Sequence, residues 1–355
     1  MKKRTILILI CIAATLVYFF FVPTQIERER YLSVAWRVTL TPENAFAGNA
    51  AAAGSDSRYT PLLLADYLCY VNREGEIGYA ETRLKRAALG NDYFINYSSI
   101  PERLLIKGND GAIISAVDTR GYPLIESERL FVLHLDRCGI SEYTSEGELL
   151  WTKRFASMIT SFSSSDSIAA LGLLDGRLLV LNPDGENLHV ETFQGGKYNT
   201  VYGCAVDQRG DMFAAFVGSL PQRLVVFEKI EGEYELVSST VLESDLRREA
   251  YVEFLDTGII VYEQEGALRV FDLEGTLTTD LTLEGRAVEA YFDRERRLIY
   301  TVAVAENGTL FTCYETTGRK IADYGFPGTV HLQARQGILF LTSGNSVFRI
   351  TVREA

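Results

Sequence analysis

One short unit recurs along this chain and constrains its fold more than any other feature of the sequence. Its clearest copy spans residues 175–193 and reads DGRLLVLNPDGENLHVETF. The apolar run at residues 178–181 is too short for a free-standing helix and suits a strand buried on both faces. Pro183, Asp184 and Gly185 then favour a tight turn, because proline presets φ and glycine accepts positive φ. The unit therefore predicts two strands joined by a sharp reversal.

The second strand of this copy has its own pattern. Apolar and polar side chains alternate along residues 187–192, with Leu188, Val190 and Thr192 on one face and Asn187, His189 and Glu191 on the other. This period of two is typical of a strand that is wet on one face.

Related units follow at regular spacing. Their starting points lie at residues 139, 176, 222, 266, 308 and 344, at intervals of 36 to 46 residues, with a degenerate early copy at 75–80. This period matches one four-stranded β-propeller blade. In the copy around residue 266 we expect strands at 251–255, 258–262, 268–271 and 277–283. In the copy around residue 308 we expect strands at 288–292, 298–304, 310–314 and 320–324.

The two ends of the chain are expected to meet. The chain ends after the third strand of its last copy, and an isolated strand is predicted at residues 33–40. An open ring would leave strand edges unpaired, so this early strand should complete the last sheet. The fold class is therefore all-β, a propeller of four-stranded blades closed by an N-terminal strand.

The number of blades has two solutions. The interval from Gly75 to Gly139 is 64 residues, too long for one blade, and contains a further unit at 111–121. Seven blades with an insertion and eight blades with one short blade both fit. We favour seven.

The repeat resembles a known group of proteins. The pattern of strand, Asp/Asn-Gly, strand, x-Asp-Gly, strand, with GELLW at residues 147–151 as its best copy, resembles the WD40-like and PQQ-like bacterial β-propeller repeats over about residues 60–350. That quinoprotein-like group includes the periplasmic propeller lipoprotein of the outer-membrane-protein assembly machine. The chain lacks the Gly-His and Trp-Asp pair of true WD40 repeats, and only one copy carries the Trp of PQQ-like repeats. The resemblance implies a propeller without a catalytic centre.

The N-terminal segment predicts a membrane anchor. Residues 5–22 carry no charge and would reach roughly 27 Å as a helix, enough to span a bilayer core. The basic residues before it should stay in the cytoplasm. We expect a cytoplasmic tail at 1–4, a transmembrane signal anchor at 5–22, a juxtamembrane linker at 23–31 and a propeller domain at 32–355. Cleavage after residue 47 and lipidation at Cys11 are the alternatives.

This arrangement places the protein in the inner membrane of a bacterium, with a single pass and its C-terminal domain in the periplasm. The net charge of -12 argues against nucleic acid as a partner, because an acidic body repels phosphate. Four cysteines lie far apart in strand-like contexts and are expected to be free thiols, although three disulfide connectivities stay open. They are Cys69, Cys138, Cys204 and Cys313.

No motif for catalysis or a cofactor is present. HExxH, EF-hand, P-loop and GxSxG sequences are absent, and no two cysteines are adjacent as they are beside the cofactor of quinoprotein enzymes. His134, His189 and His331 lie in different repeats and are expected to be surface or core residues, not metal ligands. We therefore predict no enzymatic activity, no cofactor and no metal.

The most unusual local sequence gives a candidate partner-binding site. Pro221 leads into a strand that begins with Gln222 and Arg223, and Arg247 and Arg248 are adjacent cations in an acidic protein. Since arginine forms bidentate contacts with carboxylates, these four residues could anchor an acidic segment of a partner. Ordinary salt bridges between blades are the alternative interpretation.

The sequence thus predicts a membrane-anchored, extracytoplasmic propeller that binds envelope or membrane proteins as a scaffold. The alternative is an envelope enzyme or ligand sensor that uses the central channel, for which polar residues should converge on the innermost strands. A third possibility is a membrane-anchored propeller that faces the cytoplasm.

Overall fold

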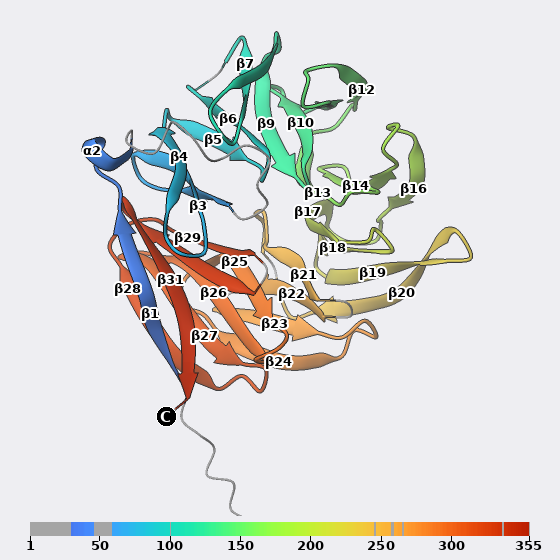
Figure 1. Cartoon of the computed structure of the whole chain (residues 1–355). Coiled ribbons are helices and arrows are strands. Elements are labelled where there is room, and N and C mark those ends of the chain that lie inside the picture. The colour runs from blue at the N-terminus through green and yellow to red at the C-terminus, as the bar shows by residue number, and fades with distance from the viewer. Residues whose placement is uncertain are drawn as a thin grey trace, which may run out of the picture. The chain divides into compact units, whose positions relative to one another are not determined.

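The computed structural model describes residues 30–45, 59–99, 101–244, 246–256, 259–264, 266–335 and 337–354 (Figure 1). Within this range Ser33–Thr351 forms one compact unit. The expected tail at 1–4, anchor at 5–22 and nearly all of the linker at 23–31 lie outside the described residues. Among the described residues, no helix has the length and apolar character needed to cross a bilayer.

The strands of this unit form eight sheets, which follow one another around a ring in chain order (Figure 1). Seven have four strands and the other, in the described part of the chain, has three. We number these blades from the N-terminal side.

The first four blades are blade 1 with β2 (Thr60–Leu63), β3 (Tyr67–Val71) and β4 (Ile77–Thr82); blade 2 with β5 (Arg86–Leu89), β6 (Tyr93–Tyr97), β7 (Leu104–Gly108) and β8 (Ile113–Val117); blade 3 with β9 (Gly121–Glu126), β10 (Arg129–His134), β11 (Gly139–Tyr143) and β12 (Leu149–Arg154); and blade 4 with β13 (Ile159–Ser164), β14 (Ala169–Leu173), β15 (Arg177–Leu181) and β16 (Asn187–Thr192).

The other four are blade 5 with β17 (Tyr198–Val206), β18 (Met212–Ser219), β19 (Gln222–Ile230) and β20 (Glu233–Leu242); blade 6 with β21 (Val252–Asp256), β22 (Ile259–Gln264), β23 (Ala267–Phe271) and β24 (Leu277–Thr282); blade 7 with β25 (Arg286–Asp293), β26 (Leu298–Ala305), β27 (Gly308–Glu315) and β28 (Lys320–Phe326); and blade 8 with β29 (Val330–Arg335), β30 (Ile338–Ser343), β31 (Ser346–Glu354) and β1 (Arg30–Thr39). A single helical turn, α2 (Pro42–Ala45), follows β1.

The predicted closure is confirmed. β1 pairs with β31 as the fourth strand of blade 8, although the two segments lie at opposite ends of the chain. The Oγ atoms of Ser33 and Thr351 lie 2.9 Å apart, and the hydroxyl oxygens of Thr39 and Ser346 lie 2.8 Å apart. The strands expected in blades 6 and 7 are also found, with small differences in their bounds.

The preference for seven blades was wrong, and the glycines explain the error. Gly139 is the first residue of the third strand of a blade, but Gly75 lies in the turn between the two outer strands. In that outer turn the glycine amide bonds to the carbonyl three residues earlier, at 3.1 Å for Gly75, 2.8 Å for Gly111 and 3.0 Å for Gly147. All three have positive φ. These equivalent turns recur every 36 residues. The 64-residue interval from Gly75 to Gly139 was instead measured between two different positions within a blade, so it did not correspond to the length of one blade.

A tryptophan contact fastens one blade to the next. Trp151 of β12 donates its Nε1 proton to the carbonyl oxygen of Pro183, at 3.0 Å, in the outer turn of blade 4. Trp36 of β1 makes the same contact, at 3.0 Å, with the carbonyl oxygen of Arg73 in the outer turn of blade 1. Two blades therefore carry this tryptophan. Trp36 was not recognised as part of the repeat, because β1 lies at the opposite end of the chain from the other strands of blade 8.

The apolar cores lie between neighbouring blades, as stacked sheets require. β15 is buried as expected, but the outer strand β16 turns its other face inward. Leu188 and Val190 are exposed, whereas the His189 ring lies 5.1 Å from the ring of Phe227 in blade 5. The longer strands of blade 5 cover the face of β16 that carries His189. The alternation was real, but it did not show which face would be covered.

We predict that Gly185→Ala destabilises the protein more than Gly232→Ala. Both glycines have positive φ, which costs an alanine about 1–2 kcal/mol. A Cβ at Gly185 would lie 2.5 Å from Cγ of Trp151, whereas a Cβ at Gly232 meets nothing within 4 Å. Displacing the tryptophan should add roughly 1–3 kcal/mol. Equal losses in urea unfolding would show that the tryptophan contact contributes little.

Candidate partner-binding rim of blade 5

Blade 5 has long strands, of eight to ten residues. In Figure 1 its outer hairpin, β19–β20, extends well beyond the body of the blade. The four candidate residues from the sequence lie on this blade or on the loop that leaves it.

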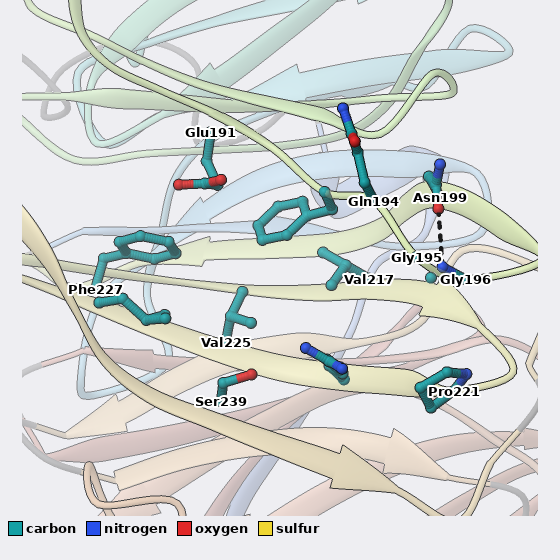
Figure 2. A pocket seen from close by; sticks show the side chains of 14 residues that line it. Glu191, Gln194, Gly195, Gly196, Asn199, Val217, Pro221, Val225, Phe227 and Ser239 are labelled. Atoms are coloured by element: carbon teal, nitrogen blue, oxygen red, sulfur yellow. Dashed lines mark hydrogen bonds between the residues drawn. The ribbon is translucent and has the colours of Figure 1, made fainter.

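A cleft of about 170 Å³ lies beside this hairpin, between β18–β20 and the connection from β16 to β17. Figure 2 shows Pro221 at one end and Phe227 at the other, with Asn199 bonded to the backbone amide of Gly196 at 3.3 Å. The apolar wall is formed by Phe193, Val217, Val225, Phe227 and Leu236. Its polar members include Glu191, Gln194, Ser239 and Arg223.

Gln222 and Arg223 have different roles because successive strand residues point to opposite faces. The Gln222 side chain is fully buried, and its amide both donates to the carbonyl oxygen of Leu246 and accepts from the Leu246 amide, at 3.0 Å. It fastens the loop that follows β20. Arg223 is exposed and lines the cleft, and its side chain has no ion pair or hydrogen bond to any other described residue.

The two adjacent arginines also differ. Arg248 forms a bidentate ion pair with Glu263 of β22, at 2.9 and 2.7 Å, and the Glu263 side chain is only 1% exposed. This contact matches the alternative interpretation, a structural salt bridge. Arg247 instead lies 5.4 Å above the ring of Tyr198 at the start of β17, and Asp245 lies outside the described residues.

One end of blade 5 therefore gathers cations and exposed apolar groups. Lys197 lies 5.8 Å from the Tyr198 ring, on the same side chain that Arg247 contacts. Tyr198, Leu220 and Val241 are 46%, 57% and 60% exposed. We define the blade 5 rim as Lys197, Tyr198, Leu220, Arg223, Val241 and Arg247. Sequence reasoning missed four of these residues, because strand pairing alone brings positions 198, 220 and 241 to one end of the sheet.

The innermost strands carry the polar groups that the alternative function requires. Desolvation raises the pKa of Glu126 on β9 to about 7 and that of Glu253 on β21 to about 8. The Tyr251 hydroxyl donates to Glu253. A second cavity, of about 380 Å³, opens among the inner strands of blades 4 to 7.

The histidines do not converge. His134 bonds to Ser141 at 2.9 Å, His331 lies 2.9 Å from Glu289, and His189 packs among aromatic rings. The structure shows no group of three or more potential metal ligands in the residues that it describes. Cys69, Cys138, Cys204 and Cys313 form no disulfide with one another, as expected, and all but Cys138 are buried.

Fold and site together define a class: an eight-bladed β-propeller with a cationic and apolar rim on one blade. A family model described as beta-propeller protein matches residues 1–355, and the chain belongs to that family. The expected place among β-propeller proteins is thereby confirmed. A Treponema pallidum (strain Nichols) protein described as uncharacterized is 22% identical over 318 residues, which cover 87% of this chain and 83% of that protein.

Two solved structures are similar in fold. BamB from Moraxella catarrhalis matches with a TM-score of 0.64 at 12% identity, over 90% of this chain and all of that one. The computationally designed Ika8 protein matches with a TM-score of 0.59 at 13% identity, over 84% of this chain and 96% of that one. At such identities the likeness concerns the fold alone.

We predict that Arg248→Ala lowers the free energy of unfolding by about 2–3 kcal/mol, because it leaves the buried Glu263 carboxylate without its cation. Arg223→Ala should change it by less than about 0.5 kcal/mol, since that side chain is exposed. Chemical denaturation of both variants checks the contrast. A stable Arg248→Ala protein would mean that Glu263 finds another partner or a proton.

Stability should also depend on pH through Glu253. The raised pKa of Glu253 means that, between about pH 4.5 and pH 8, the folded chain holds a proton that the unfolded chain has lost. This group's contribution to stability is therefore complete at low pH and is lost as pH rises through that window. Glu253→Gln should remove this pH-dependent loss of stability. The stability of the variant minus that of the wild type should therefore be greater at pH 8.5 than at pH 5. Parallel thermal unfolding curves at both pH values would contradict this.

Proposed function

We propose that this protein is a scaffold that binds a protein partner through the blade 5 rim, and that the partner presents an acidic segment with an apolar side chain. The observation that carries this proposal is Arg223: an exposed guanidinium at a cleft with apolar walls, with no carboxylate bonded to it among the described residues. Guanidinium groups at the edge of an apolar pocket are frequent anchors of protein interfaces.

Charge supports this choice of partner. The chain has a net charge of -12, so most of its surface repels an acidic segment. The rim gathers Lys197, Arg223 and Arg247 at one end of one blade, where such a segment would be attracted. Complementary charge of this kind raises the association rate and fixes the orientation of the complex. The cleft volume of about 170 Å³ suits one large apolar side chain.

The proposed setting is the bacterial cell envelope. Residues 5–22 would anchor the chain in the inner membrane, with the propeller in the periplasm and with envelope or membrane proteins as partners. The support is the uncharged apolar segment behind a basic tail. Alkaline phosphatase fused after residue 354 should be active. A reporter that is active only in the cytoplasm, fused at the same position, should be inactive. The opposite result would place the propeller in the cytoplasm.

In-cell crosslinking tests the scaffold role. We predict that the wild-type protein yields a defined crosslinked partner, that Arg223→Glu reduces its yield at least about tenfold, and that Arg103→Glu leaves it unchanged. Arg103 serves as the control because it is an arginine of blade 2 that is 67% exposed and whose ion pair with Asp118, at 3.6 Å, is also exposed. Equal losses in both variants, or none, would exclude the rim as the binding site.

A further inference from the structure

The cavity among the inner strands of blades 4 to 7 has the features of a small-ligand site. Its volume of about 380 Å³ falls within the range of ligand pockets, roughly 300–1,000 Å³. Residues of four different blades line it, with Ser161 and Phe162 from β13, Cys204 from β17, Val252 from β21 and Arg286 from β25. Its lining shares no residue with that of the cleft beside Arg223.

The cavity is lined by one cationic and one anionic side chain, Arg286 and Glu249, that form no ion pair with another described residue. Arg286 is exposed, and its side chain has no ion pair or hydrogen bond with another described residue. Glu249 is exposed too, and Arg248 bonds to its backbone oxygen, not to its carboxylate. By contrast Glu263, which also lines the cavity, is already neutralised by Arg248.

The rest of the lining is mixed in character. Phe162, Ala250 and Val288 supply apolar surface. The Ser161 hydroxyl is buried and has no hydrogen-bond partner within the described part of the chain. A buried hydroxyl in this state costs free energy unless a ligand or water satisfies it.

From these features we propose that the cavity binds a small zwitterion, a free amino acid or a short peptide. Its carboxylate would pair with Arg286, whose planar guanidinium suits bidentate contacts, and its ammonium would pair with Glu249. Its side chain would pack against Phe162. A simple anion would be repelled by Glu249 and a simple cation by Arg286, so the combination selects a ligand that carries both charges. This proposal is independent of the scaffold role.

Calorimetry with the purified full-length protein tests the proposal. The probes are the twenty free amino acids and a set of Ala-X dipeptides, each dipeptide also in its N-acetylated and its C-amidated form. We expect at least one zwitterionic probe to bind with a Kd below about 1 mM, and each blocked form of it to bind at least about tenfold more weakly. Binding by the blocked forms alone, or by no probe, would overturn the proposal.

Variants locate the site. Arg286→Gln should weaken binding of the zwitterionic probe at least about tenfold, and C-amidation of the probe should then cause no further loss of affinity. Glu249→Gln should also weaken binding at least about tenfold, and N-acetylation should then cause no further loss. Arg223→Ala, on the blade 5 rim, should leave probe binding unchanged. Thermal unfolding of each variant confirms that it is folded. Unchanged binding in both Arg286→Gln and Glu249→Gln would show that the probe binds elsewhere.

Discussion

The pairing of β1 with β31 is the contact on which the rest of the structure depends. Each sheet buries one face against the blade before it and one against the blade after it, so no blade is complete alone. Blade 8 takes three strands from the end of the chain and its outer strand from the beginning. Without that outer strand, blade 8 would lose both its edge and Trp36, which fastens it to blade 1. A few hydrogen bonds between distant segments therefore hold the whole ring.

Much of this architecture could be predicted from local signals. Short apolar runs and glycine turns indicated the strands of blades 6 and 7 and the closing role of β1, because each signal concerns a few adjacent residues or the two chain ends. The blade count failed where glycines of two different turns were treated as equivalent. Only the pairing of the strands distinguishes the outer turn of Gly75, Gly111 and Gly147 from the inner turn of Gly176, because the glycine amide in both kinds of turn bonds to the carbonyl three residues earlier. Which face of β16 is covered also depended on blade 5, whose strand lengths the pattern did not reveal.

The candidate site shows the same limit at the level of single side chains. Arg247 and Arg248 are adjacent and identical in type, yet one lies on Tyr198 and the other pairs with a buried carboxylate. Glu263 decides this difference, and it lies on a separate hairpin that no local rule connects to position 248. Gln222 and Arg223 could be separated by strand alternation alone, but the loop that engages Gln222 could not be foreseen. Composition locates cations, and tertiary contacts decide which of them pair with a buried carboxylate.

The closure also sets an order of events during synthesis. β1 leaves the ribosome about 300 residues before its partner β31. At roughly 5–20 residues per second, β1 waits on the order of 15–60 s with an open edge. During that time seven blades can form and stack, but blade 8 cannot. An unpaired strand edge is a template for other chains. Nascent chains that begin near one another could therefore exchange first strands, which makes the spacing of ribosomes on the message a determinant of correct assembly.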